Sequence, residues 1–302
     1  MTHVTTYADD KITTDVRNAW HTRALTPSFA ARVDGVDLRS VTPEQGGDLR
    51  HLLARHKVLF FSGQQLDPDS QVALGRALGD VTPSHPVVAG ADEQHPQIYA
   101  LDGQDGGRSD VWHTDVTFMQ RPPLGSILRA VQLPSLGGST SWVDLELAYA
   151  SLSPGLRALA DKLEAEHDGS REFAEHLAKR RGGEGNEWDG EKVRSLRPVS
   201  HPVVRVHPET GRRSLFVNPG FTTRVLGVSD AESRGLLDIF FAHLTKPEHM
   251  VRHAWQAGDV AMWDNRSTAH YADFDYGDFQ RIMHRITLRG DIPRGPGAPD
   301  RG

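Results

Sequence analysis

Short strand-like segments, separated by turns rich in glycine and proline, recur along most of this chain and limit the folds open to it. Alternating or continuous apolar residues predict strands at residues 57–61, 97–101, 112–118, 126–131, 138–143, 203–207, 214–218, 250–255, 260–263 and 283–290. Helices are predicted near residues 44–55, 69–78, 154–167 and 229–244. Many short strands and few helices favour a mainly β protein with flanking helices. We expect a jelly roll, with a general α+β sandwich as the alternative.

The chain is long enough to build one large β domain, with 302 residues of which 37% are hydrophobic. We expect that domain at residues 21–292. The polar start, residues 1–20, is expected to be a loose arm, and the proline- and glycine-rich end, residues 293–302, a disordered tail. Residues 169–197 are rich in arginine, glutamate and glycine, so we expect a mobile segment there.

The composition excludes several kinds of site. Without cysteine there are no disulfides, thiolate nucleophiles, cysteine-bound iron–sulfur clusters or zinc fingers, so any metal must be bound by His, Asp or Glu. A net charge of -6 argues against nucleic acid as the main partner, because phosphate binding needs clustered basic residues. The N-terminus is too polar for a signal peptide and no stretch has the length of a membrane span, so we expect a cytoplasmic protein without a membrane partner.

The tetrapeptide WHTD contains a candidate metal site. Residues two apart on a strand point the same way, so His113 and Asp115 could share one ion. Two imidazoles and one carboxylate on one face of iron(II) leave positions open for oxygen chemistry. About one such spacing is expected by chance in a chain with this many histidines, and His207 and Glu209 form a similar pair. His270, which follows an aromatic strand far along the chain, could supply the third ligand.

Two arginines lie on one face of the predicted C-terminal strand, where Arg281, Met283 and Arg285 alternate. Arg281 and Arg285 would stand ~13 Å apart, at about 3.3 Å per residue. Buried arginines are costly unless each meets an anion, and arginine pairs well with carboxylates and similar oxyanions. Two anionic ligands would explain the pattern, and ordinary internal salt bridges are the alternative.

Four ordered blocks of this sequence resemble the taurine dioxygenase family of iron(II)/2-oxoglutarate oxygenases. The blocks lie at residues 112–140, 201–211, 216–225 and 263–291, and the similarity extends over residues 25–292. The resemblance implies a double-stranded β-helix, which is a cupin-like relative of the jelly roll. It implies that His113, Asp115 and His270 bind iron(II). It also implies that Arg281 binds the far carboxylate of 2-oxoglutarate with help from the Thr140 hydroxyl, and that O2 is the other co-substrate.

The resemblance further implies a pocket for a small anionic substrate. Arg285 and His85 match the residues that hold a sulfonate. The apolar walls of the pocket match Val116, Phe173 and Phe221.

Two pocket positions depart from the taurine pattern. Val88 and Ser109 stand where taurine-specific members have a tyrosine and an asparagine. We expect the loss of these polar groups to leave a roomier and more apolar pocket with loose selectivity.

The implied reaction hydroxylates the carbon next to a sulfonate, in taurine or another alkylsulfonate, and releases sulfite and an aldehyde together with succinate and CO2. Relatives that cleave alkyl sulfate esters share the iron and 2-oxoglutarate residues, so an alkyl sulfate is the alternative substrate. A zinc hydrolase would have no use for Thr140 and Arg281 together. A non-catalytic jelly-roll binding protein whose metal is structural or lost is a further alternative, and the presence of all three ligands argues against loss of the metal. The resemblance suggests a dimer or tetramer.

Overall fold

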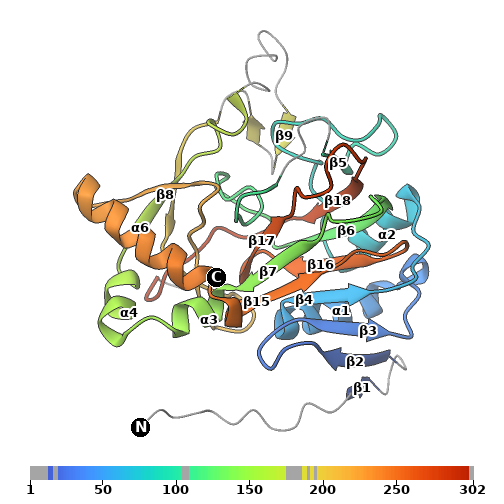
Figure 1. The fold of residues 1–302 in the computed structure, drawn as a ribbon, viewed down its shortest axis with the longest axis horizontal. Helices are drawn as coiled ribbons and strands as arrows, with labels where there is room; N and C mark the ends of the chain where they lie inside the picture. Colours follow the sequence, from blue (N-terminus) through green and yellow to red (C-terminus); the bar gives the residue numbers. More distant parts are fainter. Residues whose placement is uncertain are drawn as a thin grey trace.

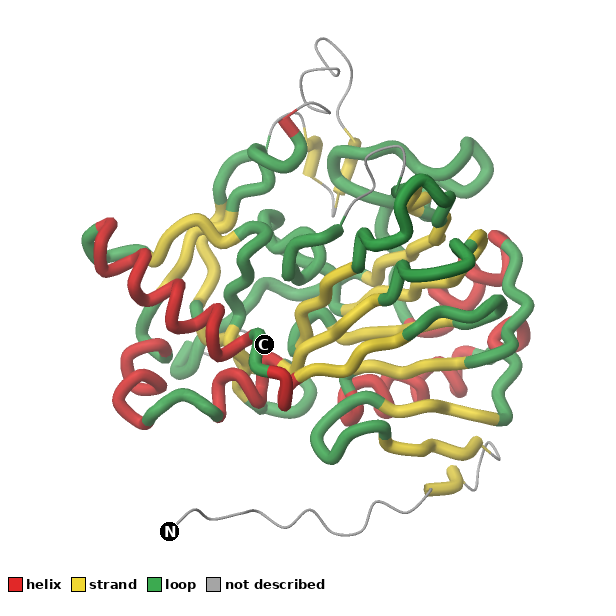
Figure 2. Tube along the Cα trace, in the orientation of Figure 1, coloured by secondary structure: helices red, strands yellow, loops and turns green. Residues whose placement is uncertain are grey.

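The computed structural model describes residues 13–15, 20–103, 109–174, 186–188, 191–193 and 196–298. Two β-sheets face each other in this part of the chain. Helices lie behind the larger sheet and at one end of the molecule (Figure 1). Strands predominate along the trace (Figure 2), so the prediction of a mainly β protein with flanking helices is confirmed.

The larger sheet has eight strands in the order β1-β2-β3-β4-β16-β6-β18-β5. Their bounds are β1 (Thr13–Asp15), β2 (Trp20–Ala24), β3 (Ala31–Asp34), β4 (Val58–Phe61), β16 (Val260–Asp264), β6 (Gly125–Gln132), β18 (Ile282–Leu288) and β5 (Tyr99–Asp102). β16 pairs with both β4 and β6, so segments far apart in the sequence lie side by side at the centre of the sheet.

Both faces of the central strands are buried, and their side chains alternate between two clusters. Leu59 and Met262 join the cluster that includes residues of α1 (Pro43–His56) and α2 (Pro68–Leu78). Phe60 and Trp263 point the other way, into the space between the two sheets. The helices therefore cover one face of the larger sheet and leave the other for the second sheet.

The smaller sheet runs β15 (Met250–His253), β7 (Thr140–Asp144) and β17 (Thr268–Ala272), with β7 in the centre. Trp142 of β7 is fully buried, with its ring centre 5.3 Å from that of Phe60 and 5.7 Å from that of Trp263. This aromatic packing fixes the smaller sheet on the larger one. The starts of β7 and β18 also lie close together, as shown by the contact between Arg281, next to β18, and Thr140 of β7.

The remaining elements lie beside the two sheets. They are η1 (Leu38–Ser40), α3 (Leu145–Ala150), α4 (Pro154–Ala160), β8 (Glu164–His167), β9 (Asn186–Trp188), β10 (Glu191–Val193), β11 (Val199–Pro202), β12 (Val204–Val206), β13 (Arg213–Leu215), β14 (Thr222–Val225), α6 (Asp230–Leu244) and η2 (Pro247–His249). The strands predicted at residues 203–207 and 214–218 are present in part as β12 and β13, which pair as a hairpin. The helix predicted near residues 229–244 is present as α6, and Ser229 and Glu232 form a reciprocal capping box at its start.

The prediction of a strand at residues 112–118 is wrong. Among these residues only His113 pairs, in an isolated bridge with His270, and the chain then turns. Val116 has a φ of 44°, and its carbonyl accepts a hydrogen bond from the Met119 N–H at 2.9 Å. A residue with positive φ cannot continue a strand, so the spacing of two residues does not by itself explain how His113 and Asp115 converge.

The predicted helix at residues 154–167 is too long. α4 ends at Ala160, and residues 164–167 form β8 instead. β8 pairs with β11 on one side and β14 on the other, which supplies the hydrogen bonds that a continued helix would have made within itself. Tertiary pairing has therefore overridden the local helical pattern.

The predicted domain boundaries remain predictions. In the arm, β1 pairs with β2, while residues 1–12 and 16–19 lie outside the described residues. In the tail, the Arg294 carbonyl accepts a hydrogen bond from the Val206 N–H at 2.8 Å, while residues 299–302 lie outside. Much of the segment expected to be mobile also lies outside, namely residues 175–185, 189–190 and 194–195. No helix in the described part of the chain is long and apolar enough to cross a membrane.

Candidate active site

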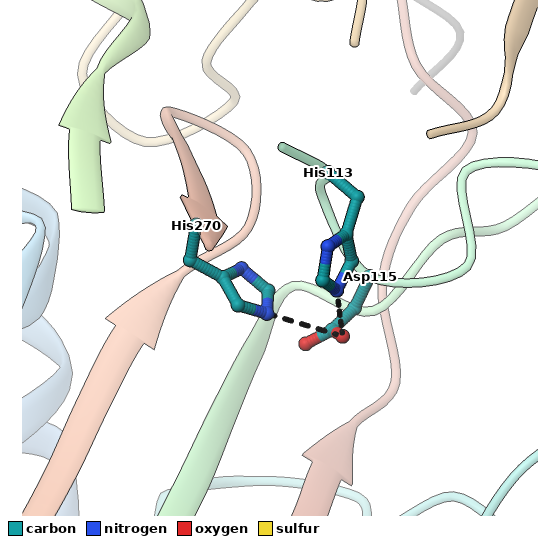
Figure 3. Close-up of side chains that lie close together, drawn as sticks. All are labelled: His113, Asp115 and His270. Carbon is teal, nitrogen blue, oxygen red and sulfur yellow. Dashed lines mark ion pairs between the residues drawn. The ribbon is translucent and has the colours of Figure 1, made fainter. Parts of the chain in front are cut away.

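A short backbone bridge brings two of the predicted metal ligands together. The His113 N–H donates to the His270 carbonyl at 3.0 Å, and the His270 N–H donates to the His113 carbonyl at 2.7 Å. Asp115 follows two residues after His113. One potential ligand atom from each residue lies within 4.8 Å of the others, and all three side chains are buried (Figure 3). The structure therefore gathers these side chains at one point, although they do not come from one regular strand.

The protonation of this cluster suits a metal ion. The Nε2 atoms of His113 and His270 lie 3.9 and 3.7 Å from Asp115 Oδ1. His113 Nδ1 lies 2.8 Å from the Val111 carbonyl, which can only accept, so Nδ1 is the protonated nitrogen and Nε2 presents its lone pair. Burial lowers the pKa of His270 well below its usual value and keeps its ring neutral. Burial would raise the pKa of Asp115, but the charge of Arg285 and the hydrogen bond from Ser126 outweigh it and hold that pKa low, so the carboxylate is ionised.

Arg281 precedes β18 and is only 7% exposed. Its Nε donates to the Gly138 carbonyl at 3.0 Å, and its Nη2 donates to Thr140 Oγ1 at 3.2 Å. Across the described ranges, no carboxylate lies within ion-pair distance of this guanidinium. A buried arginine without a protein carboxylate is suited to bind one from a ligand.

The Thr140 hydroxyl is oriented by a second donor. Trp255 Nε1 donates to Thr140 Oγ1 at 2.9 Å, in addition to Arg281. With two donors directed at its oxygen, the hydroxyl can use its own hydrogen for a third group, which must be an acceptor. Arg281 and Thr140 can therefore donate to the same anion.

A cavity of about 350 Å³ opens beside the three clustered side chains. It is lined by His85, Tyr99, Leu101, Ser109, Asp110, Val111, His113, Asp115, Val116, Glu172, Phe173, Phe221 and Arg285. Its size suits a small organic molecule.

His85 can offer an N–H to the cavity. Its Nδ1 accepts hydrogen bonds from the backbone N–H groups of Val87 at 3.1 Å and Val88 at 3.2 Å. These bonds place the ring hydrogen on Nε2 in the neutral form, which makes that nitrogen a donor.

Arg285 comes from β18 and is 5% exposed. Its Nη1 donates to Asp115 Oδ1, and its guanidinium carbon lies 5.2 Å from the ring centre of Tyr99. Its Nε has no hydrogen-bond partner among the described residues. A buried donor left without a partner points to an anion in the cavity. The alternative of an ordinary salt bridge therefore describes part of what Arg285 does, but it does not describe Arg281.

The other predicted pocket residues fall in two groups. Ser109, Val116, Phe173 and Phe221 line the cavity. Val88 is not among the lining residues, and it contacts the site through the hydrogen bond from its backbone N–H to His85.

Sequence reasoning missed several cavity residues, including Tyr99 and Leu101 of β5. Tyr99 pairs with Arg285 across the neighbouring strands β5 and β18. A prediction that paired these two strands, together with the alternation within β5, would have placed Tyr99 and Leu101 on the face of Arg285. Asp110, Val111 and Glu172 lie in irregular segments, where no periodicity indicates direction.

Residues 21–287 match the model of a protein family described as "Taurine catabolism dioxygenase TauD, TfdA family". The chain belongs to this family. An alkylsulfatase of Acinetobacter baylyi is 39% identical, covering 90% of this chain and 86% of that relative. An alpha-ketoglutarate-dependent sulfate ester dioxygenase of Pseudomonas putida is 41% identical, covering 88% of each. The crystal structure of a taurine dioxygenase from Burkholderia xenovorans is 36% identical with a TM-score of 0.78, covering 93% of this chain and 94% of that one.

Membership in the TauD/TfdA family confirms the predicted family, the jelly-roll fold and the class of enzyme, a 2-oxoglutarate-dependent dioxygenase. It also confirms iron(II), 2-oxoglutarate and O2 as the cofactor and co-substrates. The residues described above fit these groups. His113, His270 and Asp115 form the two-imidazole, one-carboxylate donor set that suits ferrous iron. Arg281 and Thr140 suit a carboxylate.

Proposed function

We propose that this chain is a dioxygenase that oxidises the carbon next to a sulfate ester or sulfonate group. The observation that supports it best is a pair of buried arginines. Arg285 contacts the candidate metal ligand Asp115 and has an Nε without a partner, and Arg281 has no carboxylate within ion-pair distance among the described residues. One anion is 2-oxoglutarate and the other is the substrate. A metal-binding protein without catalysis would have no need of this second buried cation.

In this proposal His113, Asp115 and His270 hold the iron, and Arg281 and Thr140 hold the far carboxylate of 2-oxoglutarate. When bound together, iron, 2-oxoglutarate and O2 supply the oxidising power that hydroxylates a C–H bond, with succinate and CO2 as co-products. The protein contributes orientation. Arg281 is held by the Gly138 carbonyl and Thr140, so its fork is fixed before the co-substrate arrives.

The substrate anion is bound by Arg285 and His85, which both line the cavity. Val116, Phe173 and Phe221 form an apolar wall against the alkyl part, and Ser109 lies at the same cavity. Fixing the anion decides which carbon lies near the metal, and this is the carbon that carries the sulfur group. Val88 supports His85 through its backbone N–H.

Between the two substrate classes, we favour the alkyl sulfate ester. Two relatives at 39 and 41% identity are named alkylsulfatase and sulfate ester dioxygenase. An alkylsulfonate, with taurine included, is the second candidate, because the chain is 36% identical to a taurine dioxygenase of known structure. The two differ in the product: hydroxylation next to a sulfate ester gives an aldehyde and sulfate, whereas hydroxylation next to a sulfonate gives an aldehyde and sulfite.

A substrate panel tests the proposal. Purified enzyme with iron(II), ascorbate and 2-oxoglutarate is incubated with a medium-chain alkyl sulfate, the alkylsulfonate of equal length, taurine and the matching carboxylate. Succinate, sulfate and sulfite are measured. Sulfate release coupled one-to-one to succinate supports the sulfate ester, and sulfite release supports the sulfonate. If the carboxylate alone stimulates succinate formation, the sulfur-group assignment is wrong.

Two further proposals concern the setting of the enzyme. We propose a dimer or tetramer in the cytoplasm, acting on a small molecule without a nucleic acid or membrane partner. Light scattering of the purified protein and fractionation of cells that express it test these points.

A further inference from the structure

A chain of four buried polar groups ends on the carboxylate of the candidate metal ligand Asp115. Trp263 Nε1 lies 2.9 Å from Asn265 Oδ1, Asn265 Nδ2 lies 2.9 Å from Ser126 Oγ, and Ser126 Oγ lies 2.6 Å from Asp115 Oδ2. All four residues are at most 1% exposed. Trp263, Asn265 and Ser126 have no role in the proposed function.

The hydrogen bonds that link these four side chains can run in only one direction. The indole N–H of Trp263 can only donate, so the Asn265 atom that faces it is the carbonyl oxygen, and the amide nitrogen must face Ser126. Ser126 Oγ accepts from that amide and therefore has its own hydrogen free for Asp115 Oδ2. An ionised carboxylate only accepts, so it receives that hydrogen.

The two oxygens of Asp115 consequently differ. Oδ2 is capped by Ser126 at a distance typical of a strong charge-assisted bond. Oδ1 faces His113 Nε2, His270 Nε2 and the Arg285 guanidinium. The backbone is tethered as well, because the Asp115 N–H reaches Asn265 Oδ1 at 3.4 Å.

The support for this arrangement is rigid. Ser126 belongs to β6 and Trp263 to β16, two central strands that pair in register, with Ser126 directly opposite Trp263. Asn265 follows β16 at once, and its N–H donates to the Leu124 carbonyl at 3.0 Å. Asp115, by contrast, lies in a turn with no strand partner of its own. The sheet therefore supplies the order that the turn lacks.

We propose that Ser126 is a positioning residue, oriented by Asn265, that holds Asp115 by Oδ2 so that only Oδ1 is presented to the metal. A carboxylate that binds through one oxygen leaves one more coordination position free than a carboxylate that binds through both. This inference rests on the proposed metal site, because Asp115 must be a ligand for its orientation to matter.

Anaerobic titration of the full-length apoprotein with cobalt(II), followed by visible absorption, tests the inference without relying on activity. Outer-shell partners of metal ligands typically contribute 10–100-fold to affinity. Ser126→Ala is therefore expected to weaken cobalt binding about 10–100-fold, and Ser126→Cys, which keeps the shape but donates weakly, by an intermediate factor. Asn265→Ala should also weaken binding, because it removes both the donor that orients the Ser126 hydroxyl and the acceptor of the Asp115 N–H.

The matched control is Ser214→Ala. Ser214 is another fully buried serine, and its hydroxyl donates to the Arg266 carbonyl at 2.9 Å, in the β12–β13 hairpin. It should keep wild-type cobalt affinity and spectrum. Thermal melting of the apoproteins identifies any variant that fails to fold, and if Ser126→Ala fails, the nearly isosteric Ser126→Cys decides the test.

The Asp115→Ala variant distinguishes failure of the positioning role from failure of the proposed metal site. If Asp115→Ala loses cobalt binding but Ser126→Ala and Ser126→Cys bind like the wild type, the positioning role is overturned and the proposed metal site stands. If Asp115→Ala itself binds cobalt like the wild type, the proposed metal site is wrong and the inference is overturned with it.

Discussion

Replacing Arg281 tests the most consequential side-chain assignment at this site. Arg281→Lys keeps a positive charge but removes the planar fork, while Arg281→Gln removes the charge as well. The site is built closely around the guanidinium: a Cβ added to Gly138, whose φ is +69°, would lie 3.0 Å from Arg281 Cδ and 3.1 Å from its Nε. A lysine ammonium cannot reproduce the bonds to the Gly138 carbonyl and Thr140 while also meeting a carboxylate at two points.

The expected loss follows from the number of bonds. Two of the five donors of Arg281 contact the protein, so three remain for the far carboxylate of 2-oxoglutarate. A hydrogen bond to a charged group contributes about 1.5–3 kcal/mol, so Lys, which loses one such bond, should raise the Kd for 2-oxoglutarate about 10–150-fold. Breaking a buried ion pair costs about 3–5 kcal/mol, so Gln should raise it by roughly two to four orders of magnitude.

Two measurements separate co-substrate binding from other effects. The Kd for 2-oxoglutarate is read from the visible charge-transfer absorption of the anaerobic iron(II) complex, and the KM from succinate formation at saturating substrate. The Kd for cobalt(II) should stay within about threefold of the wild type, because the guanidinium contacts no metal ligand. Arg252→Lys is the control, since this arginine is exposed and pairs with Asp273 on the surface.

Two outcomes would refute the reasoning. Wild-type affinity for 2-oxoglutarate in Arg281→Gln would mean that another group binds the far carboxylate. Equal losses of cobalt and 2-oxoglutarate affinity would mean that Arg281 supports the fold of the site as a whole and does not bind the co-substrate.

Three more predictions follow from single contacts. Trp255→Phe removes the N–H that orients Thr140, so the KM for 2-oxoglutarate should rise about 5–10-fold while kcat at saturation stays near the wild type; an unchanged KM would contradict this role. Replacing two neighbouring glycines of α1 should change the free energy of unfolding, measured in urea, in opposite directions. Gly46→Ala would place a Cβ 2.0 Å from the Ala77 carbonyl oxygen and should lower this free energy by about 1–3 kcal/mol. In Gly47→Ala the new Cβ meets nothing within 4 Å, so the free energy should rise by up to about 1 kcal/mol. Burial lowers the pKa of His201 to about 4, whereas the usual pKa of histidine is about 6.5. Between these two pH values the unfolded state binds more protons than the folded state, so the free energy of unfolding should fall as the pH drops from about 6.5 toward 4. Between about pH 7.5 and 5 this histidine contributes at most about 2 kcal/mol of that loss, and the urea midpoints of His201→Gln should depend less on pH than those of the wild type.

About half of the regular elements could be predicted, because their own residues determine them. α1 and α2 each start at a capping box followed by proline, and β4 and β16 are continuous apolar runs buried on both faces. β8 could not be predicted, because residues 164–167 carry a helical pattern and become a strand only through pairing with β11 and β14. The strand expected at 112–118 failed for a related reason: the positive φ of Val116 is imposed by its surroundings and is not visible in the residue type.

The metal cluster was predicted for a reason that differs from the one the structure gives. Alternation on a strand was expected to align His113 with Asp115, but Asp115 already lies in a turn that continues through Val116. Two other features hold the geometry: the backbone bridge from His113 to His270, and the bond from Ser126 to Asp115. Neither leaves a pattern in the sequence, because both join residues that are distant along the chain.

A ligand set that lies on a turn, an isolated bridge and the middle of β17 has a physical advantage over one that lies on a single strand. On a regular strand, side chains two residues apart are separated by about 6–7 Å and lean in the same direction. The turn at Asp115 instead directs Oδ1 to within 3.9 Å of His113 Nε2 and 3.7 Å of His270 Nε2. A turn is easily deformed, however, so convergence of this kind needs an external restraint. The one-way hydrogen-bond chain from β16 through Asn265 and Ser126 is in the right place to supply it, which ties the precision of the site to the core of the larger sheet.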